Sequence, residues 1–151
     1  MKKTFMLSLA ATSFGGLALF AQTPAAPAGD KVDFAKQILP IFEAKCMKCH
    51  ETEHTDATGR IKKPKSGLVM DTAAGLKAGG KENGDKTLVA GKAAESAIYK
   101  MTTLPITDEL FMPPEGKADP LTDAEKDLLK KWIDQGADFG TWTKWDKKKA
   151  P

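Results

Sequence analysis

Apolar positions recur with helical spacing in two segments of the chain. In residues 33–50 they lie three or four positions apart, which predicts a helix that Pro40 kinks or restarts because proline lacks an N–H. The same spacing predicts a helix after Thr122, which forms a capping-box pattern with Glu125; Gly136 is the expected left-handed cap at its end. The predicted apolar faces are Phe34, Ile38, Ile41 and Phe42 in the first helix, and Ala124, Leu128, Leu129, Trp132 and Ile133 in the second.

The region between these helices is rich in glycine and proline. Residues 51–92 contain seven glycines and are expected to form loops, with one short helix near residues 72–77. Residues 93–102 predict another short helix that stops before Pro105, and residues 105–120 are again expected to be loop. No alternating pattern of useful length predicts a strand, so the fold class is mostly α, with long Gly/Pro-rich loops.

The first 21 residues have the layout of a secretory signal peptide. Lys2 and Lys3 precede an apolar run that is short for a membrane span of about 20 residues, and Ala21 marks the expected cleavage point. An uncleaved single-helix anchor is the alternative. Residues 22–30 form a Pro/Ala-rich flexible linker. We therefore expect export to the periplasm and no stable membrane insertion after cleavage.

Length and composition fit one ordinary domain. The 151 residues are 41% hydrophobic and 28% charged, which argues against wholesale disorder. The net charge of +3 is too balanced for a dedicated nucleic-acid binder, and two cysteines cannot build a disulfide framework. We assign residues 31–140 to the domain and residues 141–151 to a basic aromatic tail, for which a frayed terminus is the simplest interpretation.

Both cysteines and one of the two histidines lie in the segment Cys46-Met47-Lys48-Cys49-His50. C-x-x-C-H is the attachment signature for c-type haem. The spacing suits this chemistry because two thiols add across the two vinyl groups on one porphyrin edge, and the histidine that follows reaches the iron. The expected cofactor is therefore one haem c, held by thioethers from Cys46 and Cys49, with His50 as the proximal iron ligand.

Three other interpretations of this segment remain open. The first is a structural disulfide between Cys46 and Cys49, although so short a loop stabilises little. The same pair fits a thiol–disulfide redox motif, which usually occurs in a βαβ context that this sequence does not supply. Together with His50 and His54 the cysteines have the residue types of a zinc site, but zinc ligands usually come in two separated pairs.

Met112 is the expected distal iron ligand. It lies in the loop segment FMPPEG, where two following prolines stiffen the backbone and leave little entropy to lose when a thioether binds iron. Met101 is the next candidate, and Met70 fits an apolar slot typical of a core residue. Met47, between the attachment thiols, and His54, four residues after the proximal histidine, are expected to stay on the proximal side.

The ordered motifs of the chain resemble the planctomycete-type cytochrome c domain over residues 32–137. The motifs are ILPIFEAKCMKCH, SGLVMDTAAGLKAGGKENG, LVAGKAAESAIY, FMPPEG and LTDAEKDLLKKWIDQGA. The resemblance implies a small cytochrome c-like helical domain wrapped around one covalently attached haem. It also implies that Cys46 and Cys49 hold the haem, that His50 is the proximal ligand and that Met112 is the distal one.

Two features depart from that family. Residues 51–65 form a longer and more charged segment than usual. We also expect the domain to stand alone and not to be fused to a larger partner. Within residues 51–65 the basic residues can balance haem propionates or dock a partner, but a solvated loop is the simpler interpretation. Trp132 is equally suited to packing on the haem and to packing in the core. The basic residues are Arg60, Lys62, Lys63 and Lys65.

The expected function is a periplasmic electron carrier and not an enzyme. His/Met ligation raises the reduction potential of a haem iron relative to other ligand sets. The partners would be redox proteins, with no nucleic acid, and a monomer is expected. The alternative is a haem enzyme or sensor with an exchangeable sixth ligand, of a peroxidase-like or gas-binding kind.

Overall fold

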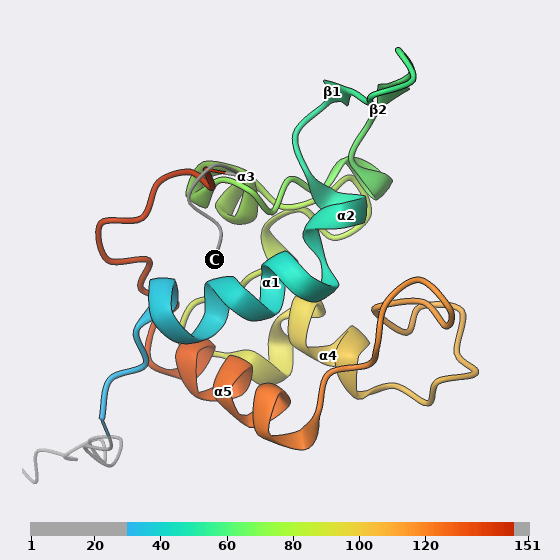
Figure 1. Ribbon diagram of the computed structural model, residues 1–151. Coiled ribbons are helices and arrows are strands. Elements are labelled where there is room, and N and C mark those ends of the chain that lie inside the picture. The colour runs from blue at the N-terminus through green and yellow to red at the C-terminus, as the bar shows by residue number, and fades with distance from the viewer. Residues whose placement is uncertain (1–29, 147–151) are drawn as a thin grey trace, which may run out of the picture.

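Residues 30–146 are described by the computed structural model (Figure 1). They contain five α-helices, several short helical turns and two short strands, which confirms the mostly α class. The expected leader, the linker up to residue 29 and the last five tail residues lie outside the described residues. None of the described helices is long and apolar enough to cross a membrane.

The helix expected over residues 33–50 forms as three consecutive pieces. These are the π-helical turn η1 (Phe34–Ile38), α1 (Leu39–Lys45) and the single turn α2 (Met47–His50). Pro40 lies in the first turn of α1, where its missing N–H costs no helical hydrogen bond. The predicted restart at this proline is therefore confirmed. The second break, at Cys46 before α2, was not predicted from the apolar pattern.

The last helix, α5 (Asp123–Asp134), begins and ends as predicted. The hydroxyl of Thr122 accepts from the N–H of Glu125 at 3.2 Å, and the carboxylate of Glu125 accepts from the N–H of Thr122 at 2.7 Å. Gly136 follows the helix with φ +100°, a conformation that favours glycine. Of the predicted apolar face, Leu129, Trp132 and Ile133 are buried, Leu128 is half-buried, and Ala124 is exposed, so that assignment was wrong.

The central part of the chain is mostly loop, as expected. α3 (Ala73–Ala78) confirms the short helix, and α4 (Ala97–Thr103) starts later than predicted because a separate 3-10 turn precedes it. No helix or strand forms in residues 105–120. The 3-10 turns are η2 (Lys65–Gly67), η3 (Gly84–Lys86) and η4 (Ala93–Glu95).

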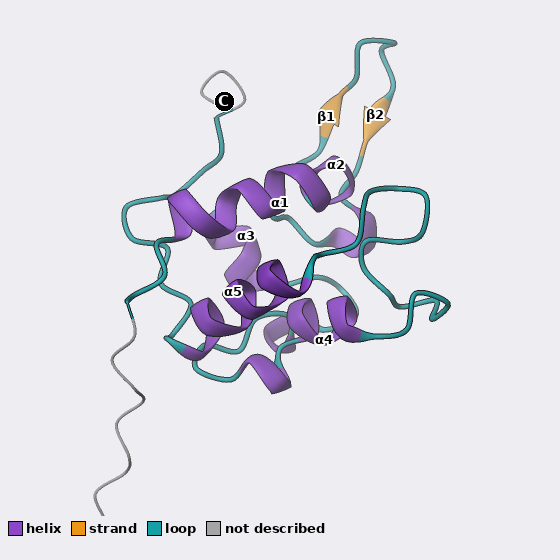
Figure 2. Ribbon diagram, turned by 60° about the horizontal axis from the view of Figure 1, so that its bottom comes forward, coloured by secondary structure: helices purple, strands orange, loops and turns teal. Residues whose placement is uncertain are grey.

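A small hairpin corrects the expectation that the chain has no strands. β1 (His54–Thr55) pairs antiparallel with β2 (Ile61–Lys62), and Figures 1 and 2 both show the pair projecting beyond α2. Two residues per strand are too few to give an alternating pattern in the sequence. The turn is held by Asp56, whose carboxylate accepts from the N–H groups of Thr58 and Arg60.

The core is built around an aromatic cluster. Trp132 of α5 packs on Phe34 at a centroid distance of 5.2 Å and edge-on to Phe42 at 6.2 Å. Its indole N–H donates to the carbonyl of Asp138 at 2.9 Å. Trp132 therefore serves the core, and its predicted alternative of packing on a haem has no support in its position.

The segment after residue 140 is packed, not frayed. Trp142 lies 4.7 Å from Phe34 between ring centroids and stacks on Phe139 at 5.9 Å. The N–H of Ala73 donates to the carbonyl of Thr143 at 3.0 Å. The interpretation as a frayed terminus was wrong as far as residue 146, because these contacts join residues too distant in sequence for a local pattern to reveal.

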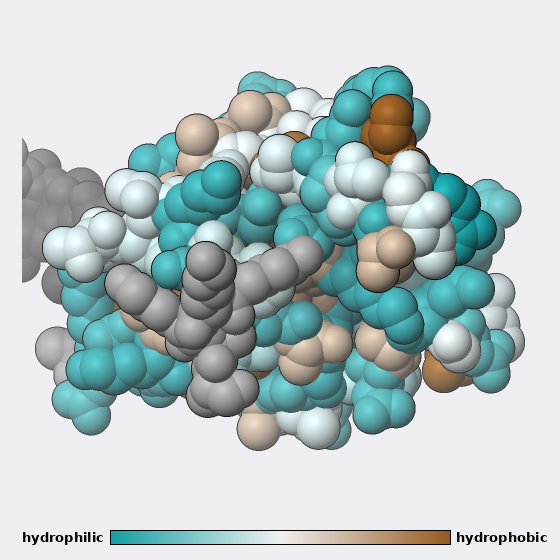
Figure 3. Space-filling model, turned by 45° about the horizontal axis from the view of Figure 1, so that its top comes forward, coloured by the Kyte–Doolittle hydropathy of each residue, from teal (hydrophilic) through white to brown (hydrophobic). Residues whose placement is uncertain are grey.

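The exposed large apolar residues are few. Figure 3 shows a face that is mainly hydrophilic, on which apolar residues form small separate spots outside the grey atoms. Ile61 lies on the hairpin, whereas Ile106 and Leu110 lie on the long loop before α5. Scattered exposure of this kind is normal for a protein surface.

Candidate functional site

The break between α1 and α2 brings the Cys46–His50 motif to one side of the helical segment. Cys46 leaves helical geometry at φ −122°, and its carbonyl accepts from the N–H groups of Cys49 at 3.1 Å and His50 at 3.2 Å. These three side chains line one cavity. Met47 does not line the cavity and is 1% exposed in the core, so it is not placed to be the distal ligand.

The cavity lies where the C-x-x-C-H motif, α4, α5 and the surrounding loops meet. It encloses about 1140 Å³ of empty space, including the part open to solvent. Its lining is mainly apolar and includes Phe42, Leu68, Ala97, Ile98, Leu121 and Leu129.

Both cysteines are free thiols, so the pair does not form a disulfide in this structure. Burial raises the pKa of the Cys46 thiol to about 12; the nearby Lys45 ammonium opposes this shift, and Cys49 and Glu125 add to it. Reactive redox cysteines have a lowered pKa, because the thiolate is the nucleophile. The surroundings of Cys46 therefore disfavour a thiol–disulfide exchange site.

His50 is placed to offer a neutral imidazole. Burial lowers its pKa, while the nearby backbone carbonyls of Leu68 and Lys65 oppose the shift. The buried Nδ1 has no hydrogen-bond partner among the described residues. A neutral ring keeps a lone pair, which a metal ligand requires.

Three methionines line the same cavity. Met112 and Met101 are neighbours, because the N–H of Met112 donates to the carbonyl of Met101 at 3.0 Å. Met70 is 2% exposed, as the prediction of a core residue requires, but it also lines the cavity. The structure thus brings both the expected distal ligand and the two other methionine candidates to the space that His50 faces.

His54 lies away from the cavity, on the hairpin. Its Nδ1 is 3.0 Å from the carbonyl of Thr52 and 3.7 Å from the carboxylate of Glu51. Within residues 30–146, no group of three or more His, Cys, Asp or Glu side chains is placed to hold a metal ion. The four-ligand zinc arrangement is therefore not formed here.

The basic residues of the hairpin segment do not reach the cavity lining. Arg60 and Lys62 lie 3.6 Å and 3.5 Å from the carboxylate of Asp56, and Lys63 lies 3.7 Å from that of Glu53. The expectation of a solvated charged loop fits these contacts. The lysines that do line the cavity are Lys45, Lys48 and Lys117.

The position of those three lysines at the cavity was not predicted from the sequence. No local pattern marks them, because their place depends on how α1, α2 and the loop before α5 come together. Similarity to known proteins adds nothing to this geometry, since no protein-family model, curated protein or solved structure matches the chain.

Proposed function

We propose that the chain is a c-type cytochrome that binds one haem and carries single electrons in the periplasm. The observation that supports this best is the shared lining of one apolar cavity. Two free thiols and His50, from a single C-x-x-C-H turn, lie there together with three methionines. Each residue type that covalent haem attachment and axial ligation need is thus present at one place.

In this proposal Cys46 and Cys49 hold the cofactor covalently. Each thiol would add across one vinyl group, with the sulfur bonding to one vinyl carbon and the thiol hydrogen going to the other. The addition needs no external oxidant. The short turn α2 keeps both sulfurs on the cavity side, which suits attachment along one edge of a planar ring.

His50 serves as the proximal ligand. Its Nδ1 is buried, so the other ring nitrogen, Nε2, would bind the iron. The lowered pKa keeps the ring neutral near neutral pH, which makes the imidazole a ligand without prior loss of a proton.

Met112 serves as the distal ligand, as the sequence and the family resemblance suggest. Its backbone is tied to Met101 by a hydrogen bond, and Pro113 beside it is buried. When bound, the haem iron supplies a one-electron ferrous–ferric couple, which His/Met ligation shifts to higher potential. The apolar side chains around the cavity exclude water from that centre.

The competing candidate is a haem enzyme or sensor with an exchangeable sixth ligand. It requires an open distal position, whereas three methionine side chains line this cavity. The natively exported protein should therefore be purified and its absorption recorded in both oxidation states, together with its mass.

An electron carrier gives one covalent haem by mass and a low-spin spectrum with a thioether–iron charge-transfer band. A high-spin spectrum and ready binding of carbon monoxide in the reduced form support the enzyme or sensor. Colourless protein with the mass of the bare processed chain rules out both.

A further inference from the structure

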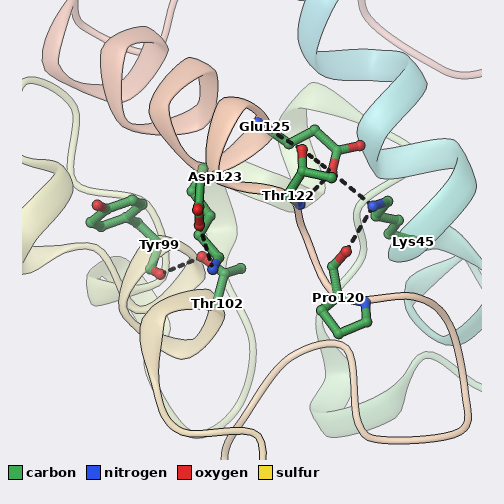
Figure 4. Close-up of polar contacts among 8 residues, drawn as sticks. Lys45, Tyr99, Thr102, Pro120, Thr122, Asp123 and Glu125 are labelled. Carbon is green, nitrogen blue, oxygen red and sulfur yellow. Dashed lines mark hydrogen bonds and ion pairs between the residues drawn. The ribbon is translucent and has the colours of Figure 1, made fainter.

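Lys45, the last residue of α1, contacts a part of the chain that is distant in sequence, where the long loop leads into α5. Its ammonium donates to the carbonyl of Pro120 at 2.8 Å and to the carboxylate of Glu125 at 2.7 Å, as Figure 4 shows. Pro120 ends the long loop that carries Met112, and Glu125 lies in the first turn of α5. Lys45 therefore links the residue beside Cys46 to the end of the loop that carries the distal ligand.

The ion pair is largely shielded from solvent. The side chain of Lys45 is 13% exposed and that of Glu125 is 24% exposed, whereas Lys130, which pairs with Asp134 on α5, is 50% exposed. Shielded charges are less screened by salt and less free to exchange partners than surface pairs. The ion pair between Lys45 and Glu125 should thus hold these two side chains in one arrangement more firmly than the surface pairs hold theirs.

Glu125 has a second role that makes the contact specific. The same carboxylate oxygen accepts from the N–H of Thr122 at 2.7 Å and from its hydroxyl at 3.0 Å. The acceptor for Lys45 is therefore held in place by the cap of α5. Lys45 therefore contacts both the cap of α5 and the loop that leads into it.

The loop has few other polar attachments. Between described residues, two hydrogen bonds join residues 112–121 to other elements: one from the N–H of Met112 to Met101, and one from Lys45 to Pro120. Prolines within this segment have no N–H to donate. Removing Lys45 would leave the downstream half of the loop anchored mainly by the buried side chain of Leu121.

We propose that Lys45 is a positioning residue, which holds the loop that carries Met112 closed over the cavity and so keeps the distal thioether in place. This inference rests on the proposed function. Lys45 touches neither iron nor the thioether in this account. It acts through Pro120 and Glu125, on the far end of the loop from Met112.

The test compares Lys45→Met with wild type as exported holoprotein. Lys45→Met should keep the covalent haem but lose part of the thioether–iron band. Imidazole should bind the ferric variant about tenfold more tightly, equivalent to roughly 1.4 kcal/mol. Trypsin should also cut faster after Lys117, which is exposed in the same loop.

Two further variants separate positioning from a general loss of stability. Lys45→Arg keeps the positive charge and can donate to both Pro120 and Glu125. It should therefore show the thioether–iron band and the weaker imidazole binding of wild type. Lys130→Met removes the lysine of the exposed pair with Asp134, and it should behave like wild type. If Lys45→Met gives no folded protein, Glu125→Gln takes its place, since it weakens the pair but leaves the bond to Pro120.

The possible results are distinct. An unchanged band, imidazole affinity and cleavage rate in folded Lys45→Met, with a normal band in wild type, would overturn the positioning role alone. Equal effects in Lys130→Met would also overturn it, since they would indicate a general response to lost ion pairs. Wild-type protein without covalent haem would overturn the proposed function and, with it, this inference.

Discussion

The N–H of Met112 donates to the carbonyl oxygen of Met101 across 3.0 Å, so the loop before α5 is joined to the last turns of α4 at the wall of the cavity. The sequence separates these two methionines by ten residues, one of which is Pro105. The hydrogen bond makes them neighbours. It explains why both remain candidates for the same ligand position, and why their roles must be separated by mutation.

Met112→Ala should leave the haem attached but open the iron to added ligands. Losing a thioether removes the ligand that raises the potential, so the midpoint should fall by on the order of 0.1 V, within the roughly 0.8 V that axial ligands span. Redox titration and the optical spectrum check this. Met70→Leu and Met101→Leu serve as matched controls, because leucine keeps a similar volume.

The outcome of this series assigns the ligand. A spectrum of Met112→Ala that equals wild type, together with loss of the thioether–iron band in Met101→Leu, would move the assignment to Met101. The same loss in Met70→Leu would assign Met70, which the sequence suggested as a core residue and the structure places at the cavity as well.

Cys49→Ala should greatly reduce the yield of stable holoprotein. One thioether would remain possible through Cys46, but the ring would lose its second covalent anchor next to His50. Pyridine haemochrome analysis and mass spectrometry measure the covalent haem. Normal yield in Cys49→Ala would contradict the attachment chemistry.

The control for this prediction lies between the two cysteines. Met47 is 1% exposed and does not line the cavity, so Met47→Leu should keep normal haem content. Its free energy of unfolding should change by less than about 1.5 kcal/mol, because the substitution conserves volume. A loss of haem in Met47→Leu would mean that general misfolding of α2 explains the cysteine result.

Local signals in the sequence predict local structure well in this chain. The cap of α5 depends on Thr122 and Glu125, three residues apart, and the restart of α1 depends on Pro40 alone. Both were therefore predictable from neighbouring residues. The C-x-x-C-H motif is local in the same sense, which is why its three side chains were found before the cavity was known.

Contacts between distant residues were not predictable in this way. Lys45 meets Pro120 and Glu125 across 75 and 80 positions, and nothing around Lys45 distinguishes it from the other lysines. Trp142 packs on Phe34 across an even longer stretch of sequence, so a basic aromatic tail was indistinguishable from a frayed end. The cavity combines such contacts, and only the fold shows that Met70 belongs to it.

The packing of Trp142 predicts how much the segment after residue 140 stabilises the fold. Trp142→Ala removes ring contacts with Phe34 and Phe139, and the free energy of unfolding should fall by about 2 kcal/mol. Trp142→Phe should retain most of that stability, because a smaller ring still packs there. Urea unfolding measures the difference, and an unchanged midpoint in Trp142→Ala would show that the segment adds nothing to the fold.

The pair between Lys45 and Glu125 predicts how stability changes with pH. Burial raises the pKa of Glu125, but the Lys45 ammonium and the Thr122 N–H lower it more, so the pKa lies below its ordinary value of 4.5. A carboxyl with a lowered pKa stabilises the folded state above its unfolded pKa, and that contribution is lost as the pH falls through the folded pKa. The stabilisation should thus be complete at neutral pH and disappear in acid.

Glu125→Gln tests this, because glutamine keeps the shape of the side chain but does not titrate. At about pH 7 the variant should be less stable than wild type by about 1–2 kcal/mol, and at about pH 3 the difference should shrink toward zero. Urea unfolding of both proteins across this range gives the curve. Glu115→Gln, in the exposed loop and without an ion pair among the described residues, is the matched control and should change the stability little. If the stability difference between Glu125→Gln and wild type stayed constant from neutral pH to acid, the charge of Glu125 would not matter. The side chain would then act only through its hydrogen bonds, and its ion pair with Lys45 would contribute no stability.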